Sequence, residues 1–251
     1  MGKIITVASG KGGTGKTTTV AAVSSSLAAL GYRTICVDFD VGLRNLDLAL
    51  GMSDYAIADF VDVVSGRMAL MEACSECPRI RGLFFLAAPA FLNQSALNEY
   101  AILRMLEEIR DEFDFCLIDA PAGIAKGFSL AHLGADMSII VTLAEIPAIK
   151  DAQRAVEEAR GMDIEEIRLL VNRAHKRRMF RTHITVDDVI DMVGAQLIGV
   201  VREDPAVSKS LFESIPLILH KRRLAAYDFL DTARRITGED LPLVFRRMAY
   251  K

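Results

Sequence analysis

The chain has 251 residues, of which 51% are hydrophobic and 25% are charged, and its formal net charge is −3. This balance excludes a disordered or collagen-like chain and a protein that binds nucleic acid through bulk positive charge. The length suits one large domain with a sizeable core. Four scattered cysteines predict a reduced cytosolic setting rather than a disulfide framework. No apolar run reaches the roughly 18 residues of a membrane span.

Short apolar runs alternate with segments of helical periodicity. Strands are predicted at Lys3–Ser9, Thr34–Asp38, Leu83–Ala88, Phe115–Asp119, Met137–Leu143, Arg168–Val171 and Leu197–Val201. Helices are predicted at Thr17–Leu30, Tyr55–Val64, Ala69–Ala73, Ala96–Phe113, Pro147–Arg160, Thr185–Val193 and Arg223–Ile236. This alternation indicates βα units, and near-continuous apolar strands indicate helices on both faces of a sheet. We predict a single-domain, doubly wound α/β fold with a mostly parallel sheet.

A glycine-rich segment follows the first predicted strand. Residues 10–17 have the sequence GKGGTGKT, which matches the P-loop pattern between a strand and a helix. In such a loop, backbone N–H groups surround phosphate oxygens and the helix N-terminus adds favourable partial charge. We expect Lys16 to reach the β- and γ-phosphates and the Thr17 hydroxyl to bind Mg²⁺. The predicted nucleotide contacts from this loop are Gly10, Gly12, Gly13, Thr14, Gly15, Lys16, Thr17 and Thr18.

A second lysine, Lys11, stands near the start of this loop. In the usual P-loop geometry a lysine there points away from its own γ-phosphate. The string SGKGGTGKTT at residues 9–18 resembles the deviant Walker A motif of the MinD/ParA ATPases. In that family the first lysine crosses a dimer interface to the partner's nucleotide. The resemblance therefore implies an ATP-bound dimer in which Lys11 acts in trans on developing phosphate charge.

Two aspartates, Asp38 and Asp40, close the second predicted strand. Their spacing places both carboxylates on one side of an extended chain, facing the crevice at the carboxyl end of the strands. Residues 38–51, DFDVGLRNLDLALG, resemble the MinD branch of the family more closely than the ParA branch. The resemblance implies that Asp40 orients the attacking water and that Asp38 helps to hold Mg²⁺ or the switch. We expect Gly42–Asp47, which includes Asn45, to be a mobile switch.

A later strand, Phe115–Asp119, has the Walker B pattern of apolar residues followed by a carboxylate. After a P-loop, this pattern predicts that Asp119 lies at the magnesium site. The next residues, 120–123 (APAG), resemble the second switch of the family. The resemblance implies that the Gly123 backbone senses the γ-phosphate.

Two acidic residues, Glu145 and Asp151, lie near the start of a predicted helix. The resemblance implies that they serve the dimer contact and the signalling helix. Acids near a helix N-terminus are also favourable in any protein, because they complement the helix dipole. Both interpretations stay open from the sequence.

The end of the chain supplies candidate contacts to the nucleotide base. Asn172 leaves a strand, and a side-chain amide can pair with adenine N6 and N7. The family also places an adenine-contacting Asn there. Residues 199–204 resemble the base-side loop of the family, which implies nucleotide contacts from Arg202 and Asp204. Relatives usually have Pro at the position of Arg202, so the shape of this loop is a point of difference.

Two further clusters suggest alternative functions. Cys74 and Cys77 form a C-x-x-C pair, and related ATPases include iron–sulfur carriers, but four thiolates would require a dimer. Basic residues lie at Arg173, Lys176, Arg177, Arg178, Arg181 and 221–223. They suit a solvated surface, DNA or anionic lipid. The alternatives are therefore a ParA-like, flagellar or cargo-positioning ATPase that binds DNA or protein, and an iron–sulfur carrier.

The C-terminus predicts a boundary between an ATPase domain, residues 1–243, and a short basic amphipathic tail, residues 244–251. Val244, Phe245 and Met248 share one helical face opposite basic residues. MinD relatives end in a membrane-binding amphipathic helix. This tail is barely two turns long, so each copy would bind weakly, although two copies on a dimer act together.

The resemblance covers residues 3 to 243 and implies a complete functional cycle. ATP and Mg²⁺ would drive homodimerisation, and slow hydrolysis to ADP would reverse it, in the service of septum site selection. The implied partners are a MinC-like division inhibitor, a MinE- or DivIVA-linked regulator and an anionic membrane surface. DNA stays an alternative. The implied location is the bacterial cytoplasm, with peripheral attachment to the inner face of the cell membrane in the ATP state.

Overall fold

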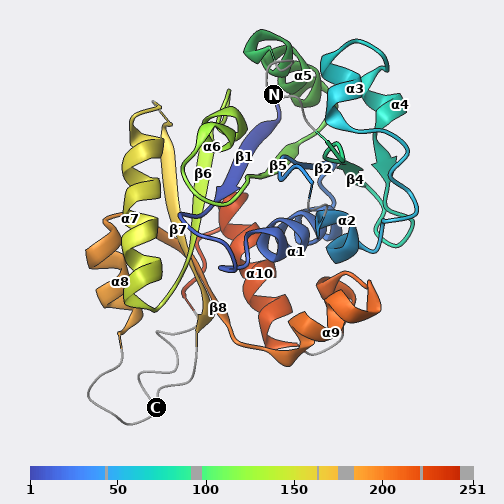
Figure 1. Ribbon diagram of the computed structural model, residues 1–251. Helices are drawn as coiled ribbons and strands as arrows, with labels where there is room; N and C mark the ends of the chain where they lie inside the picture. The colour runs from blue at the N-terminus through green and yellow to red at the C-terminus, as the bar shows by residue number, and fades with distance from the viewer. Residues whose placement is uncertain (43–44, 92–97, 163, 175–183, 221–222, 244–251) are drawn as a thin grey trace.

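One sheet runs through the middle of the computed structural model, which describes the chain except residues 43–44, 92–97, 163, 175–183, 221–222 and 244–251 (Figure 1). Among the described residues the strand order is β3-β4-β2-β5-β1-β6-β7-β8. The strands are β1 Lys3–Ala8, β2 Thr34–Asp38, β3 Ser75–Glu76, β4 Leu83–Leu86, β5 Phe115–Asp119, β6 Met137–Leu143, β7 Glu166–Ala174 and β8 Gln196–Arg202. Neighbouring strands are parallel except β3 and β4.

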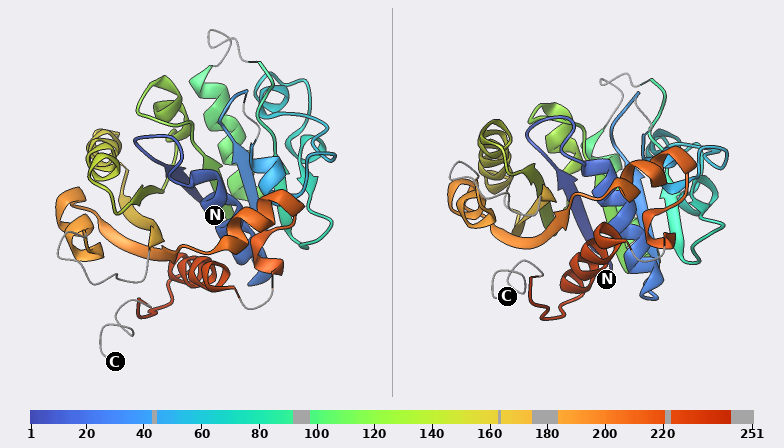
Figure 2. Two further views of the ribbon diagram at one scale, coloured as in Figure 1. Left: turned by 60° about the horizontal axis from the view of Figure 1, so that its bottom comes forward. Right: turned by 90° about the horizontal axis from the view of Figure 1, so that it is seen from below.

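Helices cover both faces of the sheet (Figure 2). One face packs against α1 Lys16–Ala29, α2 Asn45–Leu50, α9 Pro205–Glu213, the 3₁₀ turn Leu217–Leu219 and α10 Leu224–Ile236. The other face packs against α3 Phe60–Val64, α4 Leu70–Ala73, α5 Glu99–Glu112, α6 Lys126–Ala131, α7 Ile146–Arg160 and α8 Val186–Val193. The predicted doubly wound α/β fold is confirmed.

The strands from β1 to β8, apart from the short β3, are mostly apolar because each contributes to two cores. In β5, Cys116 and Ile118 belong to the core on the α5 side, whereas Phe115 and Leu117 belong to the core on the α1 side. Successive strand side chains point to opposite faces, so a strand covered on both faces needs apolar residues at every position. The polar residue of β5, Asp119, stands at the carboxyl end of the strand and is buried.

The strand order brings the sequence motifs together at one edge. β1 lies between β5 and β6, and β5 lies between β1 and β2. In register, Asp119 pairs with Val7 on one side and with Asp38 on the other. The P-loop leaves the carboxyl end of β1, so it emerges beside both aspartates. This is the position where open α/β sheets bind ligands.

Several predicted boundaries were wrong. The irregular switch predicted at Gly42–Asp47 becomes helical at Asn45, because Leu46, Ala49 and Leu50 bury against the core that includes α1. The helix predicted from Tyr55 begins only at Phe60, after an Asp59 capping box. The prediction also missed β3, α6 and α9, which are short elements with little periodicity.

The described part of the long helix α5 begins at Glu99. Its buried residues are Ile102, Met105, Leu106 and Ile109, which form the face that packs on the sheet. Several predicted features lie outside the described residues: the tail 244–251, the basic residues between 176 and 181, and Lys221–Arg222. No described helix has both the length and the apolar character that a bilayer span requires.

Candidate functional site

The P-loop joins β1 to α1 through two glycines with positive φ. Gly13 has φ +80° and Gly15 has φ +98°, a region that residues with a Cβ rarely adopt. Gly15 is the N-cap of α1, which begins at Lys16. A Cβ at Gly15 would also lie 2.2 Å from Asn172 Nδ2. The glycines at these two positions therefore allow both the turn and its close packing.

Hydrogen bonds from three directions hold the loop in place. The Asn172 amide Nδ2 donates to the Thr14 carbonyl at 2.8 Å, and the Ser9 hydroxyl donates to the Lys11 carbonyl at 2.6 Å. The Gly123 N–H donates to the Ser9 carbonyl at 3.2 Å. The predicted second switch is therefore tied to the start of the P-loop. Such contacts preorganise the loop before any anion arrives.

Two buried carboxylates lie side by side below this loop. Asp38 and Asp119 are each 1% exposed. Asp38 Oδ1 accepts a hydrogen bond from the Asp40 N–H at 2.8 Å. Asp38 Oδ2 and Asp119 Oδ1 have no hydrogen-bond partner among the described residues. Buried polar atoms are almost always paired, so two such oxygens at one place indicate a site built for a ligand.

Burial dominates the electrostatics of these groups. It raises the pKa of Asp38 to about 7 and that of Asp119 to about 8, with a hydrogen bond from Thr17 opposing the shift at Asp119. Burial lowers the pKa of Lys16, against the raising effect of the Asp119 and Asp40 charges. Burial also raises the pKa of Asp40, against the effect of Lys16. The site thus holds one cation among three acids in a partly desolvated space.

This donor set fits Mg²⁺ together with phosphate. The unpartnered oxygens of Asp38 and Asp119, with the Thr17 hydroxyl, are the hard oxygen ligands that Mg²⁺ prefers. Within the described part of the chain, no three or more His, Cys, Asp or Glu residues converge to hold a metal ion. A magnesium ion here would therefore complete its shell with water and substrate phosphate oxygens, as it commonly does.

Three of the residues predicted for the dimer contact, Lys11, Glu145 and Asp151, lie where the P-loop meets α7. Lys11 Nζ is 4.0 Å from Glu145 Oε2 of the same chain, at the start of α7. A Cβ on Gly10 would lie 2.0 Å from the Asp151 carbonyl oxygen, so the loop backbone touches α7. Asn45 is exposed at the start of α2. The fold thus presents Lys11, Glu145 and Asp151 together; their role in a dimer stays a prediction.

The predicted base-side residues have partners within the chain. The Arg202 guanidinium donates to both carboxylate oxygens of Asp228 in α10, at 2.8 Å and 2.5 Å. Asp204 caps α9 by accepting a hydrogen bond from the Ala206 N–H at 2.9 Å. The amide of Asn172 holds Thr14, as described above. Sequence reasoning missed Asp228, because an acid within a helix that follows no recognised motif gives no signal of its partner.

The cysteine pair is buried rather than presented to a partner. Cys74 is 9% exposed and Cys77 is 3% exposed, and they pack into the cores on opposite faces of the sheet. Burial raises the pKa of the Cys74 thiol to about 12, which opposes the thiolate form that a metal cluster needs. This arrangement speaks against the iron–sulfur alternative.

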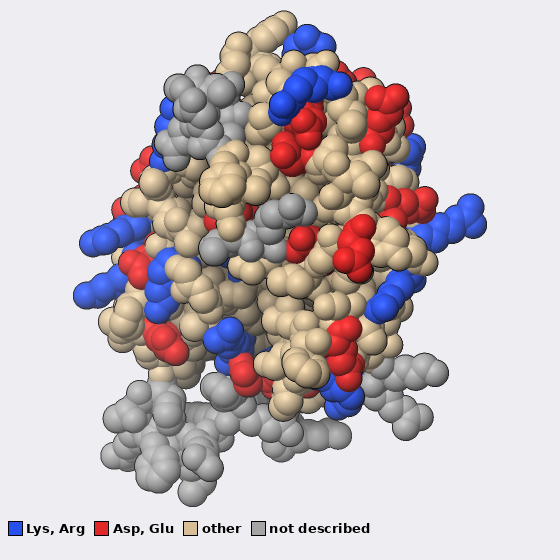
Figure 3. Space-filling model, turned by 45° about the vertical axis from the view of Figure 1, so that its right-hand side comes forward, with Lys and Arg blue, Asp and Glu red and all other residues tan. Residues whose placement is uncertain are grey.

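On the face drawn in Figure 3, acidic and basic side chains are interspersed. Among the described residues of this face, neither sign forms a continuous patch. A DNA-binding surface normally shows clustered positive charge. This face therefore offers no support for the DNA-binding alternative.

The CobQ/CobB/MinD/ParA nucleotide binding domain matches residues 5–217 of the chain. The septum site-determining protein MinD of Bacillus subtilis is 38% identical, over 97% of this chain and 92% of that protein.

Solved structures give the same grouping. A chain of the MinC:MinD cell division protein complex of Aquifex aeolicus has a TM-score of 0.89 and 34% identity, covering 96% of this chain and 98% of that one. MinD of Pyrococcus horikoshii, complexed with Mg-ADP, has a TM-score of 0.83 and 28% identity, covering 94% and 96%. The chain therefore belongs to the MinD family, within the CobQ/CobB/MinD/ParA nucleotide-binding domains.

Proposed function

We propose that this protein is an ATP-dependent dimerising switch ATPase that regulates where the cell divides. The observation that carries the proposal is the pair of buried, unpartnered carboxylate oxygens on Asp38 and Asp119, next to Lys16 and beneath a preorganised P-loop. A buried acid pair with a lysine and a helix N-terminus suits a metal-bound polyphosphate, because the ligand's charges complement both sets of groups.

The residues of the site divide the work of phosphoryl transfer. The P-loop amides and Lys16 bind the β- and γ-phosphates, and Thr17, Asp38 and Asp119 hold Mg²⁺. When bound, the magnesium ion neutralises phosphate charge. Asp40 is partly buried beside Lys16 and orients the attacking water. Hydrolysis of ATP to ADP is expected to be slow in the isolated protein.

In the dimer, Lys11 of each chain would add a second cation to the phosphates bound by the other chain. Lys11 rests 4.0 Å from Glu145 of its own chain, and the two side chains are 33% and 61% exposed. An exposed pair of this kind is weak, so Lys11 can exchange it for a partner's phosphate. Asn45, Gly123 and Asp151 would complete the contact. ATP then favours the dimer because it binds the dimer more tightly than the monomer.

The cell-division role rests on the names of the relatives and on one solved complex, that of Aquifex MinC with MinD. We propose a MinC-like division inhibitor as partner and a MinE- or DivIVA-linked regulator as trigger of hydrolysis. We also propose that residues 244–251 form a separate tail. The tail would attach the cytoplasmic protein to the inner face of the cell membrane in the ATP state.

Light scattering coupled to size-exclusion chromatography tests the switch. Asp40→Ala should be a dimer with Mg-ATP and a monomer with ADP, because binding survives while hydrolysis stops. Asp40→Ala combined with Lys11→Ala should bind ATP and remain a monomer. A dimer that forms equally well without nucleotide would contradict the proposal.

Cosedimentation of Asp40→Ala with phosphatidylglycerol vesicles tests the tail. Pelleting with ATP, but not with ADP, is expected, and Phe245→Glu should abolish it. Failure to pellet with vesicles, together with ATP-dependent and salt-sensitive retention on DNA, would favour the DNA-bound positioning alternative.

A further inference from the structure

The loop predicted to face the nucleotide base is joined to α10 chiefly by the buried carboxylate of Asp228. Asp228 accepts hydrogen bonds from the Arg202 backbone N–H at 2.9 Å, from its Nε at 2.8 Å and from its Nη2 at 2.5 Å. The side chain of Asp228 is 1% exposed and that of Arg202 is 15% exposed. One carboxylate therefore fixes both the backbone and the side chain of the last residue of β8.

A second contact holds the same loop against the same helix. Asp204 Oδ2 accepts a hydrogen bond from the Ala225 N–H, in the first turn of α10, at 3.2 Å. Its other oxygen caps α9. The segment between Arg202 and Asp204 is thus anchored at both ends to α10.

The packing of α10 on β8 allows this approach. A Cβ at Gly199 would lie 2.3 Å from Thr232 Oγ1, so only glycine at this point of β8 lets the helix come so close. Figure 1 shows α10 beside β8. Asp228 is one helical turn before Thr232, whose hydroxyl donates to the Asp228 carbonyl at 2.8 Å. α10 therefore packs closely enough on β8 for the Asp228 carboxylate to reach Arg202 at the end of the strand.

The anchored loop adjoins the residue that holds the P-loop. The Glu203 N–H donates to the Ala174 carbonyl at 3.1 Å, and Ala174 lies two residues after Asn172 in β7. Asn172 in turn holds Thr14 in the P-loop. Residues 172–174 at the end of β7 and residues 202–204 at the end of β8 thus form one continuous surface beside the phosphate loop, which we call the base-side wall.

We propose that Asp228 is the positioning residue of the base-side wall, and that it sets how tightly the site holds the base of a nucleotide. The proposal rests on the proposed function, because it needs a nucleotide in the P-loop. Asp228 itself touches no ligand; it acts by keeping residues 202–204 in the shape that the base meets. Removing its charge leaves the phosphate end of the site unchanged and makes the wall reorder each time a base binds.

Isothermal titration with Mg-ATP and with Mg-tripolyphosphate separates the two ends of the site. Asp228→Asn, a substitution of nearly equal size, should weaken ATP binding about tenfold, because a charge-assisted anchor is lost. It should leave tripolyphosphate binding unchanged, since that ligand has no base. A general loss of structure would weaken both ligands equally.

Two companion variants keep the result interpretable. Asp231→Asn removes an equal charge from the same helix, at a residue that makes none of the hydrogen bonds described for Arg202, and it should bind ATP like the wild type. Asp228→Glu retains the charge and should bind ATP between the wild type and Asp228→Asn. Circular dichroism confirms that each variant is folded at the assay temperature.

The outcomes are distinct. A loss confined to ATP in Asp228→Asn, or in Asp228→Glu if the first variant does not fold, supports the proposal. Equal losses for both ligands, or no loss, overturn it. If the wild type binds neither ligand, the proposed function fails first.

Discussion

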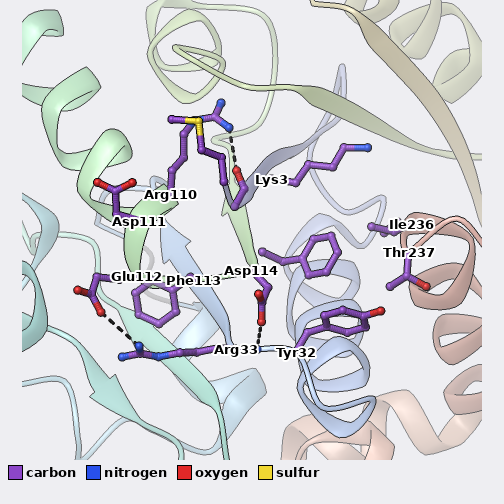
Figure 4. A pocket seen from close by; sticks show the side chains of 13 residues that line it. Lys3, Tyr32, Arg33, Arg110, Asp111, Glu112, Phe113, Asp114, Ile236 and Thr237 are labelled. Atoms are coloured by element: carbon purple, nitrogen blue, oxygen red, sulfur yellow. Dashed lines mark hydrogen bonds and ion pairs between the residues drawn. The ribbon is translucent and has the colours of Figure 1, made fainter.

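Charged groups are paired at the amino ends of the strands (the amino edge of the sheet) but not fully paired at their carboxyl ends (the carboxyl edge). At the amino edge a hollow of about 550 Å³ opens among the strand starts, shown in Figure 4. Its lining arginines are paired: Arg33 with Glu112 at 3.2 Å, and Arg110 with Asp136 at 2.7 Å. At the carboxyl edge, Asp38 and Asp119 keep unpartnered oxygens among the described residues. Two adjacent buried carboxylates with unpartnered oxygens, rather than empty volume, therefore mark the functional edge.

The amino edge illustrates what charge does when it serves only the fold. Arg110 donates to the Gly2 and Gly134 carbonyls and to both oxygens of Asp136. Asp136 also accepts a hydrogen bond from the Ile4 N–H at 2.7 Å. These bonds join α5 to the starts of β1 and β6 and pair the charges of Arg110 and Asp136 with each other.

Replacing one lysine at each edge of the sheet gives the strongest test of the difference between the edges. Lys16→Ala should lower ATP turnover about a hundred- to a thousandfold, because a buried cation that meets phosphate charge is lost. Lys3→Ala, which removes only the partly exposed pair with Glu166, should leave turnover unchanged. Phosphate release measures both. Turnover of Lys16→Ala within tenfold of the wild type would contradict the assignment.

The second test concerns the stability of the nucleotide-free protein. The folded pKa of Asp119 is about 8, above its ordinary 3.8, so its contribution to stability is present below about pH 4 and lost as the pH rises to about 8. Asp119→Asn should remove this loss, and at pH 8 it should be more stable than the wild type by a few kcal/mol.

Urea denaturation in EDTA between pH 5 and pH 8 measures this effect. The same variant should lose Mg-ATP turnover, so that stability and activity change in opposite directions. If the free energy of unfolding varied with pH in the same way for the wild type and for Asp119→Asn, burial would not raise the pKa of Asp119.

A histidine near the amino edge gives the opposite pH dependence. His132 Nδ1 lies 2.8 Å from the Phe128 carbonyl and Nε2 lies 2.8 Å from the Ser138 hydroxyl. Burial lowers its pKa from 6.5 to about 4. Its stabilising contribution is therefore complete above about pH 6.5 and is lost as the pH falls to about 4, by on the order of 3 kcal/mol. His132→Gln should show a flatter curve over this range in the same denaturation experiment.

The smallest expected change comes from the structural ion pair. Asp136→Asn should lower the free energy of unfolding by about 2 kcal/mol, because charge-assisted hydrogen bonds from Arg110 are weakened at a partly exposed position. Its ATP affinity should equal that of the wild type. A change in ATP affinity would mean that the amino edge takes part in nucleotide binding and would blur the contrast between the edges.

Prediction from the sequence succeeded where the signal was local. The P-loop, the Asp38 strand end and the Asp119 strand end each carry their pattern within a few consecutive residues, and parallel strands bring such ends to one edge. It failed for α2, where a predicted switch becomes helical at Asn45 because Leu46, Ala49 and Leu50 find a core to bury in. Periodicity in so short a segment is too weak to show this.

The contacts around the base-side wall show the other limit. The family resemblance implies that Arg202 contacts the nucleotide; in the fold its guanidinium is held by Asp228, 26 residues later in the chain. No spacing rule links a strand end to the middle of a following helix. That pairing depends on how deeply α10 sits on β8, which Gly199 and Thr232 decide.

The sequence by itself determined the fold class, the phosphate loop and the order of the motifs, because these depend on hydrophobic periodicity and on short strings whose chemistry is local. Only the tertiary structure decided which charges are satisfied. It left Asp38 and Asp119 with unpartnered oxygens, paired Arg202 with Asp228, and placed Lys11 beside Glu145. Whether a charge finds a partner depends on distances between segments far apart in the chain, and those distances exist only once the helices have packed on the sheet.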